Sequence, residues 1–254
     1  MWSLASGLEG RIAIVTGAAG GIGSACLRAF AGAGTHVVAC DVDRARLQTA
    51  FASMSREPGH LSVVADLTRP EDVEQLIEQT MSAFGRLDIL VHTAAIHLRL
   101  PFERVDEPAW QRYMDANLKS AFLVSRAVSA PMRAARWGRI VHFTSLAAFT
   151  GGFQPQTSVV YSTTKGAILT MTRSLAHVLA PDNVLVNAVA PGGVLTPMAA
   201  SLSREALDAY ARAVPLGRLA TPDEIANVVL FLASDHASYI TSAVLDVNGG
   251  AYNH

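Results

Sequence analysis

Short apolar segments alternate with longer amphipathic segments along the whole chain. Seven short runs rich in Val, Ile, Leu and Ala have the length of strands: Arg11–Thr16, Thr35–Cys40, Leu61–Ala65, Leu87–His92, Gly138–Thr144, Val184–Val189 and Ala243–Val247. Six longer segments carry apolar residues at helical spacing: Ile22–Ala33, Arg44–Met54, Pro70–Ala83, Asn117–Ala135, Tyr161–Ala180 and Pro222–Ser234. Apolar strands joined by helices are typical of a parallel sheet covered on both faces. The pattern therefore predicts an α/β fold, a doubly wound parallel sheet.

Nothing in the pattern divides the chain. No repeat, low-complexity tract or Pro/Ser-rich linker interrupts the 254 residues, so we expect a single domain over 1–254. Thr68 and Thr221 each precede Pro and acidic residues, an order typical of an N-cap and first helical turn. Residues 195–216 show scattered helical signal and no strand. A long insertion late in such a fold often forms a lid or substrate loop, and we expect one here.

Composition narrows the classes of partner. Charged residues make up 16 %, below the roughly 25 % usual for soluble domains, which favours tight packing and subunit contacts that cover apolar surface. The net charge of -1 offers no basic surface to a nucleic acid. No apolar run reaches the roughly 18 residues of a membrane span, and the first ten residues lack the features of a signal peptide.

Cysteine and histidine usage favours a cytoplasmic protein without a metal. Cys26 lies in a helical pattern and Cys40 ends a strand, so we expect buried, reduced thiols rather than a disulfide or a catalytic thiol. The eight histidines form no HExxH or Cys/His cluster, so no metal site is expected.

A glycine-rich stretch, TGAAGGIG at 16–23, joins the first predicted strand to the first predicted helix. A helix N-terminus presents unpaired N–H groups and a positive dipole end, which suit a pyrophosphate. Glycines let the chain turn sharply and let phosphate oxygens reach the backbone. An ordinary tight strand–helix turn is the alternative interpretation.

The TGxxxGxG spacing of this stretch resembles that of the short-chain dehydrogenase/reductase family, and further motifs match over nearly the whole chain. The resemblance implies a Rossmann-like sheet with strand order 3-2-1-4-5-6-7. Its second motif is YSTTK, from Tyr161 to Lys165. Residues four apart share a helix face, and an ammonium beside a phenol lowers the phenol pKa from about 10. The alternative is an interior Tyr and a surface Lys at a chance spacing.

The resemblance implies a catalytic set of Asn117, Ser145, Tyr161 and Lys165. In the family the Tyr passes the proton, and the Lys also holds the nicotinamide ribose. The Ser hydrogen-bonds the reacting oxygen, and the Asn backbone carbonyl holds a water in a proton relay to the Lys. Thr144 is an adjacent hydroxyl, but the alignment of the motif favours Ser145. For Asn117, a polar residue at a helix kink is the alternative.

Asp41 follows the second predicted strand, about twenty residues beyond the glycines, where an acid accepts both ribose hydroxyls. Its carboxylate would repel a 2′-phosphate, and no Arg or Lys occurs at 18–20, so NAD is favoured over NADP. Arg44 and Arg46 are expected to be solvated helix residues. The resemblance places Asp66 at the adenine, although Asp66 could instead cap a helix.

The cofactor contacts implied by the resemblance are Gly17, Gly20, Gly21, Ile22, Gly23, Asp41, Asp66, Leu67, Thr93, Ala94, Tyr161, Lys165, Pro191, Val194 and Thr196. One stretch departs from the family pattern, because the usual Asn-Ala-Gly is replaced by Thr93-Ala94-Ala95. The added methyl group of Ala95 leaves the backbone contacts to the cofactor open at this point.

We expect substrate contacts from Ser145, Tyr161, His97, Phe153 and Gln154. Further candidates for the pocket are Leu98, Phe149, Val160 and Met198. Because these side chains are mostly apolar, a medium-sized secondary alcohol or ketone is favoured over a sugar or a small acid. Arg99 could anchor an acidic group, and a solvated loop arginine is the alternative.

The leading interpretation is an oxidoreductase that transfers hydride between NAD(H) and a secondary alcohol or ketone. An NADPH-using 3-oxoacyl-thioester reductase is a second interpretation, against which Asp41 argues. A non-catalytic dinucleotide sensor or scaffold is a third, against which the intact Ser145, Tyr161 and Lys165 argue. The predicted helices 117–135 and 161–180 occupy the positions of the family's main subunit contact, so a homo-oligomer, most readily a homotetramer, is expected.

Overall fold

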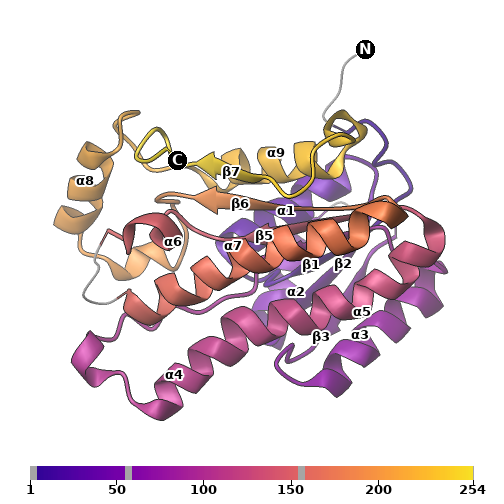
Figure 1. The fold of residues 1–254 in the computed structure, drawn as a ribbon, viewed down its shortest axis with the longest axis horizontal. Helices are drawn as coiled ribbons and strands as arrows, with labels where there is room; N and C mark the ends of the chain where they lie inside the picture. Colours follow the sequence, from indigo (N-terminus) through magenta and orange to yellow (C-terminus); the bar gives the residue numbers. More distant parts are fainter. Residues whose placement is uncertain (1–4, 55–58, 154–157, 254) are drawn as a thin grey trace.

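A seven-stranded parallel sheet lies at the centre of the molecule (Figure 1). The computed structural model describes residues 5–54, 59–153 and 158–253. The strands are β1 (Ile12–Thr16), β2 (His36–Asp41), β3 (Leu61–Val64), β4 (Ile89–His92), β5 (Gly138–Phe143), β6 (Val184–Pro191) and β7 (Val244–Val247). They lie in the order β3-β2-β1-β4-β5-β6-β7, which confirms the predicted doubly wound, Rossmann-like fold and its strand order.

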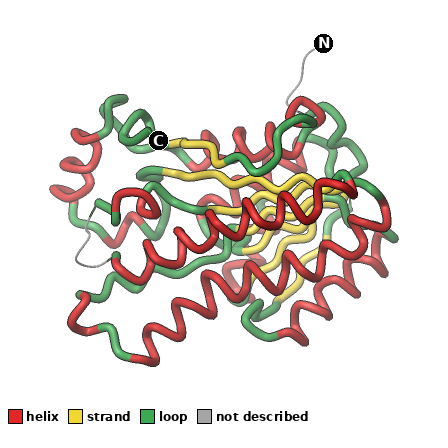
Figure 2. Tube along the Cα trace, viewed as in Figure 1, coloured by secondary structure: helices red, strands yellow, loops and turns green. Residues whose placement is uncertain are grey.

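Helices cover both faces of this sheet (Figure 2). They are α1 (Gly21–Gly32), α2 (Arg44–Ala52), α3 (Pro70–Phe84), α4 (Glu107–Tyr113), α5 (Ser120–Ala135), α6 (Ala147–Thr150), α7 (Val159–Leu179), α8 (Arg204–Ala213) and α9 (Pro222–Ala233). Successive side chains of a strand point to opposite faces. Accordingly, Ala13 and Val15 of β1 pack into the core formed with α1 and α9, whereas Ile12 and Ile14 pack into the core formed with α3, α5 and α7.

Burial along the central strands explains why their sequences are mainly apolar. Every residue of β1, β4, β5 and β6 is buried, as expected for central strands covered on both faces. The edge strand β3 is partly exposed. Because all strands are parallel, their carboxyl ends meet along one edge of the sheet, and this edge carries the candidate site.

The largest departure from the predicted helices lies before α5. One helix was predicted over 117–135, but α5 begins at Ser120 and is preceded by α4 and by a π-helical turn over Met114–Lys119. Asp106 begins α4 by accepting a hydrogen bond from the backbone N–H of Ala109. The π-helical turn depends on tertiary contacts of Asn117, described below, and local periodicity carries no signal for it.

The two predicted N-caps have different outcomes. Thr221 caps α9 in a reciprocal arrangement with Glu224, which confirms the prediction. For α3 the prediction is wrong, because the cap position is Arg69 and its side chain makes no capping bond. The Thr68 hydroxyl donates to Asp66 Oδ1 over 2.8 Å instead, and Asp72 Oδ2 accepts from the Asp66 N–H over 2.8 Å.

The late segment over 195–216 contains a 3₁₀ turn at Ala199–Ser201 and the helix α8, and no strand within the described residues. Figure 1 shows α8 beside α6, at the edge where β6 and β7 end. Cys26 and Cys40 are free and buried, as expected. Burial raises the pKa of Cys26 to about 12 and also raises the pKa of Cys40, so both stay protonated thiols.

Two histidines lie inside the sheet, on neighbouring strands. His92 Nδ1 is 3.0 Å from Thr16 Oγ1, and His142 contacts Ser125 Oγ and Thr172 Oγ1 through its two ring nitrogens, each at 2.9 Å. Burial lowers the pKa of both rings, that of His142 to about 4, and the charge of Lys165 adds to the effect. Both rings are therefore neutral at pH 7.

Candidate active site

A cavity of about 790 Å³ opens along the carboxyl ends of the strands. The glycine-rich loop and Asp41 line one end, Ser145, Tyr161 and Lys165 line the middle, and Phe153 and Tyr210 line the other end. This is where parallel α/β sheets bind ligands, at the carboxyl edge of the sheet. The described cavity is large enough to hold a dinucleotide and, next to one end of it, a small substrate.

The glycine-rich loop cannot carry side chains at several positions. Gly17 has φ +65°, and a Cβ there would lie 2.7 Å from the Ala94 backbone nitrogen. A Cβ on Gly23 would collide with the Gly17 carbonyl. Helix α1 begins after Gly20, which provides no side-chain cap, and its first turn contains no acidic residue. The N–H groups of that turn therefore face the cavity in the way that suits a pyrophosphate.

Asp41 is fixed at the end of β2 by two backbone donors. Its Oδ2 accepts from the Ala19 N–H over 2.9 Å and its Oδ1 accepts from the Asp43 N–H over 3.0 Å. Arg46 was predicted to be a solvated helix residue. In the structure its Nη2 donates to the Ala19 carbonyl over 3.1 Å, and the residue lines the cavity. An acid and a base thus both face this end of the site.

The loops after β3 and β4 complete this end of the cavity. Asp66, Leu67 and Thr68 line it, and Asp66 Oδ1 accepts from the Thr68 N–H over 3.0 Å, so the carboxylate shapes its own loop. Thr93 donates its hydroxyl hydrogen to the Thr16 carbonyl over 2.7 Å, tying β4 to the start of the glycine-rich loop. Ala94 lies against Gly17.

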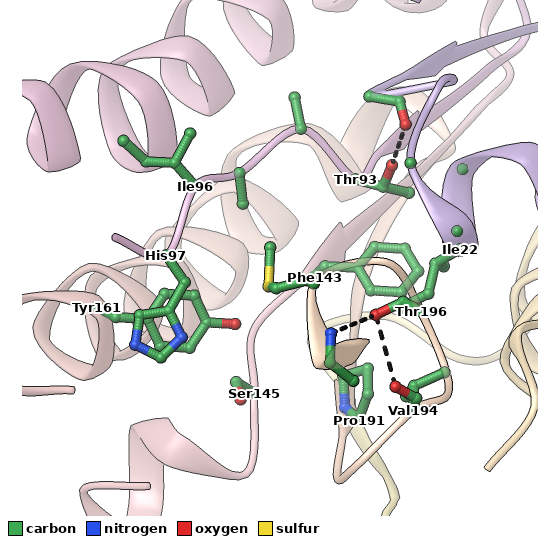
Figure 3. A pocket seen from close by; sticks show the side chains of 18 of the residues that line it. Ile22, Thr93, Ile96, His97, Phe143, Ser145, Tyr161, Pro191, Val194 and Thr196 are labelled. Atoms are coloured by element: carbon green, nitrogen blue, oxygen red, sulfur yellow. Dashed lines mark hydrogen bonds between the residues drawn. The ribbon is translucent and has the colours of Figure 1, made fainter. Parts of the chain in front are cut away.

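Helix α7 brings Tyr161 and Lys165 to the same side of the cavity, one turn apart. Ser145, which comes from the loop after β5, lines the same part of the cavity as Tyr161 (Figure 3). Lys165 Nζ donates to the Phe143 carbonyl over 2.8 Å. The Thr144 hydroxyl donates to the Lys165 carbonyl over 2.8 Å, whereas Ser145 lines the cavity beside Tyr161.

The protonation of this centre differs from the simple expectation for an ammonium beside a phenol. Burial raises the pKa of Tyr161, and the neighbouring Ser145 hydroxyl and the charge of Arg99 oppose that shift. Burial lowers the pKa of Lys165 to about 8. Lys165 is held by the backbone of β5, and the net shift of the Tyr161 pKa is away from phenolate. The phenol is therefore the resting form at neutral pH.

Asn117 lies in the π-helical turn, and its side chain makes hydrogen bonds that hold neighbouring segments together. Its Oδ1 accepts from the Ile96 N–H over 2.7 Å, and its Nδ2 donates to the Ile96 carbonyl and to Thr164 Oγ1, each over 3.1 Å. It thus joins the loop after β4 to α7, next to Lys165. The backbone carbonyl, the group that the resemblance assigns to a proton relay, is left separate from these side-chain bonds.

The segment after β6 closes the cavity over the N-terminus of α1. Pro191 ends β6, Val194 is buried, and Thr196 donates its hydroxyl hydrogen to the Val194 carbonyl over 3.5 Å. A Cβ on Gly21 would lie 2.8 Å from Thr196 Cγ2, so Gly21 lets this segment approach the helix. Ile22 lines the same region (Figure 3).

Aromatic rings surround the reacting end of the cavity. The His97 ring stacks on Tyr161 with centroids 4.4 Å apart and an interplanar angle of 13° (Figure 3). Phe153 stacks on Tyr210 of α8 at 4.3 Å and 4°. Sequence reasoning missed Tyr210, whose only signal is its place on one face of the amphipathic helix α8.

The other candidates for the substrate pocket have mixed outcomes. Leu98, Arg99 and Met198 line the described cavity. Val160 is buried, and Phe149 stacks on Tyr252 at 5.3 Å, and neither is among the residues that line the cavity. Gln154 lies outside the described residues.

Comparison with known proteins identifies the family. A family model described as enoyl-(acyl carrier protein) reductase matches residues 17–252. This chain belongs to the short-chain dehydrogenase/reductase family. The resemblance inferred from the glycine-rich loop and the YSTTK motif is thereby confirmed, and the protein is an oxidoreductase of the CH–OH and keto class.

Relatives of this short-chain dehydrogenase/reductase match it over nearly their whole length. The 3-oxoacyl-(acyl-carrier-protein) reductase FabG of Aquifex aeolicus is 40 % identical over 247 residues, covering 96 % of this chain and 98 % of the relative. The acetoacetyl-CoA reductase of an Acinetobacter species is 35 % identical, covering 97 % and 99 %. The crystal structure of a short-chain dehydrogenase/reductase titled glucose/ribitol dehydrogenase, from Brucella melitensis, superposes with a TM-score of 0.90 at 35 % identity, covering 97 % of this chain and 98 % of that chain.

Within the described ranges, no helix combines the length and the apolar character that a bilayer span requires. Among the same residues, no three His, Cys, Asp or Glu side chains come together in a way that could hold a metal ion.

Proposed function

We propose that this protein catalyses NAD(H)-dependent oxidoreduction at C3 of an acyl thioester, converting a 3-oxoacyl and a 3-hydroxyacyl group into one another. The observation that carries the proposal is that Ser145, Tyr161 and Lys165 line one cavity, with Lys165 one turn beyond Tyr161 along α7. The named activities of the Aquifex and Acinetobacter relatives support the thioester class. They favour it over the apolar secondary alcohol expected from the sequence.

The residues at the carboxyl edge fit a nicotinamide dinucleotide. The uncapped N-terminus of α1 suits the pyrophosphate, and the close approaches at Gly17, Gly21 and Gly23 leave room for backbone contact. When bound, the dinucleotide would donate or accept a hydride at its nicotinamide ring. Thr196, which closes over α1, and Lys165 would hold the nicotinamide half, and Asp41 the adenosine ribose.

The protein's own part in the reaction is to hold the reacting oxygen and to move one proton. The oxygen would sit between Ser145 Oγ and Tyr161 Oη, because both side chains line the same part of the cavity. Tyr161 is protonated at rest, so in the reductive direction its Oη gives the proton as negative charge develops on the substrate oxygen. Ser145 stabilises that charge as a hydrogen-bond donor. Lys165 and the Asn117 backbone would return a proton to Tyr161.

NAD is the proposed cofactor because Asp41 is fixed toward the site. The carboxylate is oriented by two backbone N–H groups and would repel a 2′-phosphate. Arg46 is the opposing feature, since its guanidinium lies at the same glycine-rich loop. We expect Asp41 to dominate, because the Arg46 side chain is already engaged by the Ala19 carbonyl.

The experiment is a comparison of acetoacetyl-CoA reduction with NADH and NADPH, beside a panel of secondary alcohols with NAD. The proposal expects reduction of the thioester, with kcat/KM at least about tenfold higher for NADH than for NADPH. Asp41→Ala should relax this preference, and Arg46→Ala should leave NADH use intact while lowering the residual NADPH use. Turnover of simple alcohols without thioester turnover would overturn the substrate class, and equal use of both cofactors in the wild type would overturn the choice of NAD.

A further inference from the structure

Arg99 lies in the loop after β4 and lines the reacting end of the cavity. Its Nε is buried and has no hydrogen-bond partner. Its Nη2 reaches the Met198 carbonyl at 3.4 Å, a long contact at the limit of a hydrogen bond. The guanidinium is thus held inside the cavity wall with most of its donors available to a ligand.

The surroundings of Arg99 are phenols rather than carboxylates. Tyr161 and Tyr210 line the cavity together with Arg99, and the Tyr113 hydroxyl oxygen accepts from the N–H of the adjacent Leu98 over 2.7 Å. Burial raises the pKa of all three phenols, and the charge of Arg99 opposes the shift in each. Seven described arginines form salt bridges with acids: Arg11, Arg28, Arg69, Arg86, Arg133, Arg136 and Arg218. Arg139 also has a buried Nε without a hydrogen-bond partner, but its guanidinium lies 4.3 Å from the centroid of the Trp137 ring and it is not among the residues that line the cavity. Among the described residues, the ion pairs found include none for Arg99.

The backbone of Arg99 is also unusual. Its φ is +53°, in the left-handed region that is uncommon for a residue with a side chain and is enriched at functional sites. Arg136 has nearly the same φ, but its guanidinium lies on the surface and pairs with Asp182. A charge that is partly withdrawn from water without a counter-charge is costly, so the missing partner of Arg99 is expected to come from outside the chain.

We infer that Arg99 binds a carboxylate on the substrate, separate from the carbonyl that is reduced. The planar guanidinium presents paired donors that match a carboxylate, and the stacked pairs His97–Tyr161 and Phe153–Tyr210 would flank the carbon chain between the two groups. The inference rests on the proposed function. For a thioester substrate it specifies an acyl chain with a second acid group, the monothioester of a dicarboxylic acid.

The test compares two substrates of equal chain length that differ only in the terminal group. They are the N-acetylcysteamine thioesters of 3-oxohexanedioic acid, which ends in a carboxylate, and of 3-oxohexanoic acid, which ends in a methyl group. Wild type should reduce the carboxylate substrate with a kcat/KM at least about tenfold higher, the range expected for a charge-assisted hydrogen bond. Arg99→Met should abolish this preference while leaving the methyl substrate within about threefold of wild type. Arg99→Lys should keep part of the preference, because a point charge remains without the paired donors.

The matched control is Arg104→Met, an exposed arginine in the 3₁₀ turn shortly after Arg99. It should retain the wild-type preference. If Arg99→Met instead lowers turnover of both substrates equally, Arg99 only ties the loop after β4 to the segment around Met198, and the inference is overturned. Equal rates for the two substrates in the wild type overturn it as well, while the proposed thioester activity stands.

A binding measurement separates failure of the inference from failure of the proposed function. Calorimetry with the protein and NADH compares hexanoate with hexanamide, which have the same chain but differ in charge. Hexanoate should bind more tightly to wild type, and Arg99→Met should remove the difference. If neither thioester is reduced, the proposed function fails, and the inference survives only if hexanoate still shows the Arg99-dependent binding.

Discussion

Replacing His142 by Gln is expected to make the protein less sensitive to acid. His142 is buried between Ser125 and Thr172 and its pKa is lowered to about 4, below the ordinary value of 6.5. The unfolded chain therefore binds a proton near pH 6.5 that the folded chain does not bind. The contribution of His142 to the free energy of unfolding is therefore fully present above pH 6.5, and it is lost as the pH falls toward 4.

The size of the effect follows from the two pKa values. Between pH 7 and pH 5, a histidine that titrates near 6.5 when unfolded and near 4 when folded costs about 2 kcal/mol of unfolding free energy. His92 acts in the same direction, since burial lowers its pKa as well. His142→Gln should remove the His142 share, because the amide can replace both hydrogen bonds without titrating.

The assay is urea unfolding of wild type and His142→Gln at pH 7 and pH 5, with the free energy of unfolding compared at each pH. His177→Gln, an exposed histidine on α7, is the control and should behave like wild type. The variant and wild type can differ in their free energy of unfolding at pH 7, because the test compares how much each of them loses between pH 7 and pH 5. The reasoning is refuted if wild type and His142→Gln lose the same stability on acidification.

Other expected outcomes concern the site, a helix cap and assembly. Tyr161→Phe should lower thioester reduction by at least about a hundredfold while NADH binding by calorimetry stays near wild type, with the exposed Tyr239→Phe as control. Lys165→Ala should weaken NADH binding as well as turnover; unchanged affinity would contradict its ribose contact. Thr221→Ala should cost about 1 kcal/mol of unfolding free energy in urea, and no loss would show that the reciprocal cap contributes nothing. Sedimentation at micromolar concentration should show a tetramer, because Phe122 of α5 and Val178 of α7 are exposed apolar residues on the outer helices, and a monomer alone would refute this.

Much of the fold could be predicted because the strands are buried on both faces. Strand β1 is apolar at every position except its last, so its place in the chain is visible without tertiary information. The site followed from motifs whose spacing is local, the glycine-rich loop and the pair Tyr161–Lys165. In each case the residues that act together lie within one turn or one loop.

The features that were missed depend on contacts between distant segments. The π-helical turn is held by Asn117 bonding to Ile96 and Thr164, neither of which is near it in sequence. The cap of α3 is a local exception, because the helix begins after Arg69, one residue beyond Thr68. Arg46 and Tyr210 enter the cavity only after α2 and α8 are docked. The spacing of residues within one helix or strand does not predict contacts between separate helices and strands.

The bond from Lys165 Nζ to the Phe143 carbonyl has a consequence for how this sequence can diverge. The ammonium is positioned by a main-chain atom, and that atom is the last one of a strand whose pairing with β4 and β6 fixes its place. Any residue at position 143 that keeps the strand intact presents the same backbone carbonyl, so a substitution there leaves the hydrogen bond of Lys165 in place. Substitutions in the side chains of β5 can therefore accumulate during evolution while the distance between Lys165 and Ser145 stays constant. Proteins whose sequences differ at most positions can for this reason share one reacting centre.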